Sequence, residues 1–176
     1  MPERHALQRV AAVIARRRVT AGFVLGLFSL WLAQPTPRSL AIGAALALIG
    51  EALRVWAAGH LEKGREVTSS GPYAMTRHPL YLGSGLIAAG IAVASARATV
   101  VIMVASYLAV TITAAVLTEE AQLTERFGER YPEYRDGRSP AGARRFSPAR
   151  VIRNREYRAL LGLALALALL AWKTTR

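Results

Sequence analysis

The residues best suited to chemistry lie in one stretch, GPYAMTRHPLYLGSG, at positions 71–85. Pro79 fits the first turn of a helix, because the N–H group that proline lacks has no partner there. The free N–H groups of that turn favour an anionic group, and Arg77 and His78 stand directly beside them. The stretch therefore predicts a site for an anion at the start of an apolar helix.

Small residues continue the same stretch one turn further into the helix. Gly83 and Gly85 remove side chains, which would let a ligand lie against the helix backbone. The same glycines, together with Ser84, are also typical of two helices that cross closely in lipid. Spacing alone leaves both interpretations open.

Two adjacent carboxylates, Glu119 and Glu120, follow the next apolar segment. Taken alone they describe a solvated helix face. Neighbouring helical positions diverge by about 100°, so at most one of them faces the interior of a helix bundle. Together with Arg77 and His78 they form a group that matches a zwitterion with a cationic amino group and an anionic carboxylate.

The elements that carry these residues are apolar segments separated by charged loops. Charge is absent between Arg18 and Arg38, between Arg77 and Arg97, and between Arg97 and Glu119. Each gap is roughly the 20 residues that cross a bilayer as a helix. The expected fold class is all-α, a polytopic transmembrane helix bundle of about five segments: 19–34, 39–61, 79–96, 98–118 and a shorter run at 159–172.

We expect one membrane domain over residues 1–176. It divides into a basic N-terminus, four transmembrane helices with one polar loop, a polar segment and a short apolar helix: 1–18, 19–118 with the loop 61–78, 119–158 and 159–172. The last run has only 14 apolar residues, which leaves a tilted span, an interfacial helix and a re-entrant piece open.

Charge and composition exclude several classes of function. The net charge is +12, and residues 1–18, 61–78 and 119–158 hold five, three and ten of the 23 basic residues. Because cytoplasmic loops of membrane proteins are enriched in Lys and Arg, these segments predict a cell-membrane protein with a cytoplasmic N-terminus. No nucleic-acid partner is expected, since no basic stretch alternates with stacking aromatics. The sequence has no cysteine, and we predict no metal site.

A further pair of charges lies inside the second apolar segment. Glu51 and Arg54 are three positions apart and share a helix face. Charged residues inside a span face the bundle interior or a partner, so a buried ion pair and a substrate contact are both open.

Taken together, the motifs resemble a known family. GPYAMTRHPLYLGSG, followed about 34 residues later by EEAQLTERFGERYPEY and preceded by GEALRVWAAGHL, resembles the isoprenylcysteine carboxyl methyltransferase and phospholipid methyltransferase superfamily of integral membrane enzymes. The resemblance covers residues 50–135. It implies a helical membrane fold that binds S-adenosyl-L-methionine near the cytoplasmic side, with a lipophilic or lipid substrate; the sequence does not indicate an oligomeric state.

The resemblance also assigns roles by position. It matches an R-H-P-x-Y-x-G element, a G-x-G element and paired glutamates, which implies cofactor binding by His78, Pro79, Tyr81, Gly83, Ser84, Gly85, Glu119 and Glu120. Methyl transfer from a sulfonium mainly requires that two reactants be positioned and water excluded. Arg77 or Arg54 would hold a carboxylate acceptor, whereas His78 is the better base for an amine acceptor.

Two other functions compete with the methyltransferase. Membrane sterol reductases carry a similar His-Pro-x-Tyr element and bind NADPH, but their pattern resembles H-P-N-Y, and this chain has Leu80 at the Asn position. A non-catalytic membrane scaffold is the third possibility, which would be favoured if side chains filled the predicted cofactor pocket.

Overall fold

The computed structural model describes residue 17, residues 19–140 and residues 142–176. This part of the chain is helical and contains no strand, which confirms the all-α fold class. The basic N-terminus predicted at 1–18 lies almost wholly outside the described residues.

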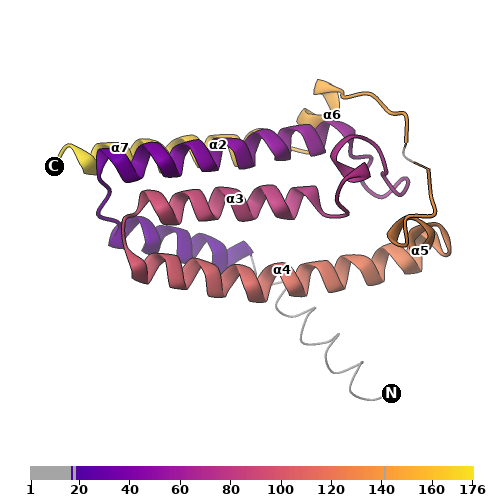
Figure 1. The fold of residues 1–176 in the computed structure, drawn as a ribbon, viewed down its shortest axis with the longest axis horizontal. Coiled ribbons are helices and arrows are strands. Elements are labelled where there is room, and N and C mark those ends of the chain that lie inside the picture. The colour runs from indigo at the N-terminus through magenta and orange to yellow at the C-terminus, as the bar shows by residue number, and fades with distance from the viewer. Residues whose placement is uncertain (1–16, 18, 141) are drawn as a thin grey trace, which may run out of the picture.

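Five apolar helices form the bundle (Figure 1). Three are long and apolar enough to cross a membrane: α2 (Pro37–His60), α4 (Ala98–Phe127) and α7 (Tyr157–Thr174). Two are shorter, the helix Val19–Leu32 and α3 (Pro79–Ala94). The remaining elements are the 3-10 turn η1 (Gly71–Ala74) and the short helices α5 (Arg130–Arg135) and α6 (Pro148–Arg153).

Local sequence explains where these helices begin. Thr36 caps α2, since its side chain accepts a hydrogen bond from the Ser39 N–H while the Ser39 hydroxyl accepts one from the Thr36 N–H. Pro79 occupies the first turn of α3 as predicted. The connection from α3 to α4 is only a few residues long, with Ala96 at a φ of 52°, so the two helices form a hairpin.

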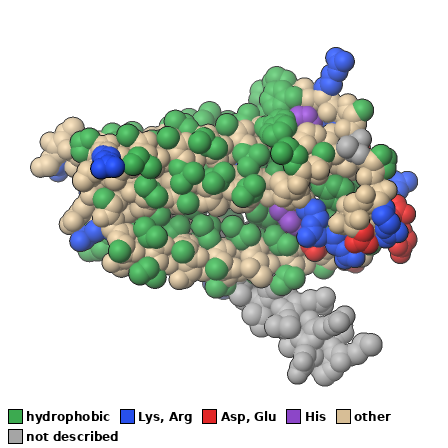
Figure 2. Space-filling model, viewed as in Figure 1, with side chains coloured by type: hydrophobic (Ala, Val, Ile, Leu, Met, Phe, Trp, Pro, Cys, Tyr) green, Lys and Arg blue, Asp and Glu red, His purple; other side chains and the backbone are tan. Residues whose placement is uncertain are grey.

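The polar residues gather at one end of the bundle, which we call the polar end. There α2 ends, α3 and α7 begin, and α5 and α6 cover the helix ends (Figure 1). The space-filling view shows acidic and basic side chains concentrated at this end and apolar side chains along the sides (Figure 2). Outward-facing residues such as Phe23, Ile49 and Leu165 are more than half exposed, which fits a lipid surround.

Two boundaries differ from the sequence expectation in informative ways. Helix α4 continues without a break to Phe127, about two turns past the expected membrane exit at Thr118, so Glu119 and Glu120 lie inside a helix. Helix α7 has 18 residues, longer than the apolar run at 159–172, and lies alongside α2 (Figure 1). Its length and placement favour a span over an interfacial or re-entrant piece.

Candidate active site

The polar ends of α3 and α4 bring the predicted charged residues together. His78 is the residue before α3, and its Nε2 lies 3.0 Å from Oε1 of Glu120 on α4. Nη1 of Arg77 lies 3.3 Å from the same oxygen. Residues 42 positions apart thus form one cluster, in which a carboxylate faces a guanidinium and an imidazole.

An open groove of about 380 Å³ lies between α3 and α4 next to this cluster. Its lining is mostly apolar and comprises Thr76, His78, Tyr81, Leu82, Gly85, Leu86, Ile112 and Val116. The volume falls within the range of roughly 300–1,000 Å³ typical of small-molecule sites. A Cβ atom added at Gly85 would meet only Cδ1 of Ile112, at 4.0 Å, so this glycine leaves space in the groove. The ring of Tyr81 lies beside that of His78, with their centroids 5.8 Å apart.

The three residues of the G-x-G element face different neighbours. Gly83 packs on α2, where an added Cβ would lie 2.6 Å from Cγ of Arg54 and 2.7 Å from the carbonyl oxygen of Gly50. Ser84 accepts a hydrogen bond from Nη1 of Arg54 at 2.5 Å. Only Gly85 lines the groove, so the packing and the ligand interpretations of these small residues apply to different positions.

Arg54 is paired, but not with Glu51. Its Nε lies 2.5 Å from Oε1 of Glu156, a buried residue just before α7 and 102 positions away. Its Nη1 also reaches the carbonyl oxygen of Leu80 at 3.4 Å. Glu51 is 3% exposed, and neither of its carboxylate oxygens has a hydrogen-bond partner among the described residues. No local sequence signal identified Glu156.

The two adjacent glutamates face different neighbours. The side chain of Glu119 forms no hydrogen bond or ion pair within the described part of the chain. Burial and the nearby Glu119 carboxylate raise the pKa of Tyr73, a buried residue of η1. Burial and the Glu120 carboxylate raise the pKa of Tyr131 on α5. The two carboxylates therefore diverge, as neighbouring helical positions must.

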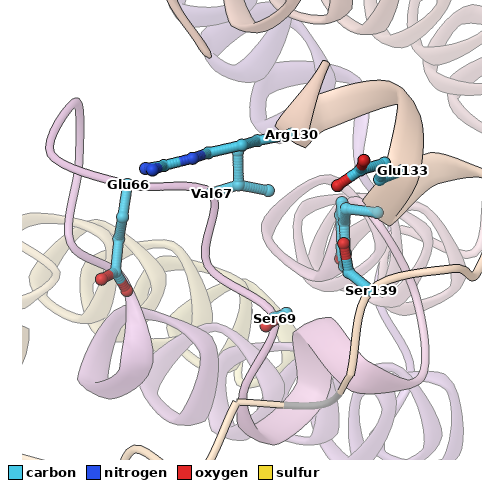
Figure 3. A pocket seen from close by; sticks show the side chains of 7 residues that line it. Glu66, Val67, Ser69, Arg130, Glu133 and Ser139 are labelled. Carbon is cyan, nitrogen blue, oxygen red and sulfur yellow. The ribbon is translucent and has the colours of Figure 1, made fainter. Parts of the chain in front are cut away.

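A second cavity lies outside this cluster, between the loop after α2 and the α5 region (Figure 3). It measures about 180 Å³ and is lined by Glu66, Val67, Ser69, Arg130, Glu133, Tyr134 and Ser139. This is smaller than most ligand sites, and none of the predicted catalytic or cofactor-binding residues lines the cavity. The α3–α4 groove is the better candidate site.

Comparison with known proteins identifies the family of the chain. The sequence model of the phospholipid methyltransferase family matches residues 18–130, which include all of α3 and α4 and every residue of the Arg77–His78–Glu120 cluster. The chain belongs to this family. The resemblance noted in the sequence is thereby confirmed, and the protein is a membrane methyltransferase by family. No curated protein and no solved structure matches the chain.

The family match ends before several residues that pack around the polar end of the bundle. Tyr131, α6 and α7 all follow residue 130, and so does Glu156, the partner of Arg54. The groove belongs to the family region, whereas one buried ion pair behind α3 depends on a segment that the family match does not cover.

Proposed function

We propose that this phospholipid methyltransferase family member uses S-adenosylmethionine to methylate a lipophilic acceptor at the cytoplasmic face of the cell membrane. The observation that carries the proposal is the Arg77–His78–Glu120 cluster at the mouth of the α3–α4 groove. An open groove at Gly85 argues against the scaffold alternative, in which side chains would fill the pocket.

The residues present fit the cofactor. S-adenosylmethionine supplies a methyl group on a cationic sulfur and carries a zwitterionic amino-acid end. The carboxylate of Glu120 would hold the amino group, and Arg77 with the N–H groups of the first turn of α3 would hold the carboxylate. Gly85 gives the close approach to the helix backbone, and the apolar lining excludes water.

For the acceptor, the residues suggest two roles. His78 lines the groove and would take the proton of an amine acceptor. Arg54, predicted as a carboxylate-binding residue, is held by Glu156 and Ser84, so an acceptor carboxylate would have to displace Glu156. A lipid-soluble acceptor reaches the groove from the side, because the groove opens between two apolar helices.

Binding of S-adenosylhomocysteine to single variants tests the proposal. If Glu120 pairs the amino group of the ligand in a partly desolvated site, Glu120→Gln should weaken the binding free energy of S-adenosylhomocysteine by roughly 2–5 kcal/mol. This corresponds to about thirty-fold or more in affinity. Glu119→Gln is the matched control, because it removes the same charge one position away and should be nearly silent. Calorimetry on detergent-purified, monodisperse protein gives both values.

Two further ligands make the result specific. Methylthioadenosine lacks the amino-acid end, so its affinity should not change in Glu120→Gln. NADPH should not bind at all. Saturable NADPH binding without any S-adenosylhomocysteine signal would establish the reductase alternative, and equal affinities of parent, Glu119→Gln and Glu120→Gln would move the cofactor site elsewhere.

Residues 61–78 and 119–158, which are rich in Arg and Lys, lie at the polar end of the bundle. Because cytoplasmic loops are enriched in these residues, the proposed orientation places the polar end in the cytoplasm. A single cysteine at Ser69 or Ser139 should resist membrane-impermeant labelling from outside intact cells. Labelling at either position would reverse the orientation without affecting the assignment of the groove.

A further inference from the structure

Residues 145–158, which we call the basic segment, carry an unusual concentration of exposed arginine. The segment has five arginines and one acidic residue, Glu156, which is buried against Arg54. Arg145, Arg155 and Arg158 are exposed and form no ion pair with any described carboxylate. Their positive charge is thus left for a partner outside the described chain.

Exposed apolar side chains alternate with these arginines. Phe146 is 44% exposed, Ile152 67% and Tyr157 45%. Phe146 lies against Gly59 and the ring of His60 on α2, and Ile152 is the most exposed of the three. Arginine combined with bulky apolar residues on one short segment is typical of surfaces that lie in the interfacial layer of a membrane.

The basic segment is held firmly at the end of α2. Nε of Arg150 lies 2.8 Å from Oε1 of Glu62, and its Nη1 donates to the Gly59 carbonyl oxygen at 2.8 Å. Asn154 donates to the carbonyl oxygen of Ala58 at 2.9 Å. The hydrogen bond from Arg150 also lowers the pKa of Glu62, so this carboxylate keeps its charge to a lower pH than an ordinary glutamate.

The position of the basic segment relative to the membrane indicates what kind of partner it binds. Helix α7 begins at the end of this segment, and α2 ends beside it, so the segment lies where two candidate spans leave the apolar layer (Figure 1). Helix α5 lies farther along the long axis of the molecule than α6 (Figure 1). The basic segment is therefore the arginine-rich surface nearer to the bilayer headgroups.

We propose that the basic segment is a docking surface for the headgroups of anionic phospholipids. The guanidinium forks of Arg145, Arg155 and Arg158 match phosphate oxygens, and Ile152 would enter the acyl boundary. None of these three arginines, nor Ile152, lines the α3–α4 groove.

Thermal unfolding of detergent-purified protein tests this, since a ligand that binds only the folded state raises Tm. Phosphatidylglycerol should raise Tm more than phosphatidylcholine does. The triple variant Arg145→Gln, Arg155→Gln, Arg158→Gln should lose most of this difference, with an apparent affinity for phosphatidylglycerol weakened roughly a hundredfold at low salt.

A matched triple variant controls for net charge. Arg126→Gln, Arg130→Gln, Arg138→Gln removes the same charge from exposed positions near α5 and should keep the phosphatidylglycerol response. The single variants Arg145→Gln and Arg158→Gln provide the same comparison if the first triple variant does not fold. Ile152→Ser should weaken the response to the lipid.

Four outcomes would overturn the proposal. These are equal responses to the two lipids, an equal loss in both triple variants, an equal rise with inorganic phosphate alone, and a rise with a short RNA but not with phosphatidylglycerol. The third would indicate a small-anion site and the fourth a nucleic-acid surface. None of the measurements uses methyl transfer or S-adenosylhomocysteine, so the proposed function stands or falls separately.

Discussion

Helix α3 meets its two neighbours in opposite ways. Against α2 the backbones touch: a Cβ added at Gly90 would lie 2.5 Å from the Gly43 carbonyl oxygen, and one added at Gly50 would lie 2.7 Å from that of Gly83. Against α4 the contact is made near the hairpin turn, where Ala92, Val100 and Val104 form a buried cluster. Toward the polar end α3 and α4 leave the groove open, and Gly85 has free space in front of it.

The difference shows how one short helix serves both stability and binding. The α2–α3 interface is closed by glycines and, at its polar end, by the hydrogen bond from Arg54 to Ser84, while Arg54 is also paired with Glu156. Because α3 is held in place by α2, its opposite face can leave a groove toward α4 without α3 shifting. We therefore expect substitutions on the α2 side to change stability, and substitutions on the α4 side to change ligand binding.

The largest expected effect on stability comes from Glu156→Gln. It leaves the largely buried Arg54 guanidinium without its charged partner, and breaking a buried pair in this way costs about 3–5 kcal/mol. The free energy of unfolding, measured by SDS titration in detergent micelles, should fall by this amount. Glu125→Gln, at an exposed position on α4, is the control.

A double variant separates loss of charge balance from loss of packing. Replacing both partners, as in Arg54→Met with Glu156→Leu, removes the unpaired charge and should restore most of the stability. If Glu156→Gln unfolds like the parent protein, the pair does not hold α7 on the closed side of α3.

The next effect concerns the glycines of the closed interface. Gly90→Ala places a Cβ against backbone atoms of α2, which cannot rotate away, so we expect a loss of about 1–3 kcal/mol. Gly162→Ala on α7 is the matched control, because an added Cβ there meets nothing within 4 Å. The same SDS titration should show a lower free energy of unfolding for Gly90→Ala and a higher one for Gly162→Ala. A change in the same direction for both variants would contradict a tight α2–α3 contact.

Much of this architecture follows from sequence. The charge gaps predict the apolar helices, and Pro79 marks the start of α3. The juxtaposition of His78 with Glu120 follows from a hairpin, because both residues lie at its open end. These predictions succeed because each depends on local spacing or on a short connection.

Other features of the site could be seen only in the structure. Positions 83 and 85 are about 200° apart on a helix, so no pattern within the G-x-G element tells which glycine meets a neighbouring helix. The partner of Arg54 was equally hidden, since Glu156 is brought to it by the packing of α7 on α2. The nearer candidate, Glu51, is one turn away on the same helix yet is not paired with it.

The smallest effect on stability should come from Gly85, and it distinguishes the two sides of α3 most directly. Gly85→Ala should leave stability unchanged or raise it by up to about 0.5–1 kcal/mol, because alanine favours a helix over glycine and the space is free. Gly85→Leu should also fold, since its side chain extends into the groove, but it should abolish S-adenosylhomocysteine binding. SDS titration and calorimetry on the same samples separate the two quantities. If Gly85→Leu bound S-adenosylhomocysteine like the parent, the groove would not be the cofactor site, whereas a large loss of stability in Gly85→Ala would mean that α3 is closed against α4 as well.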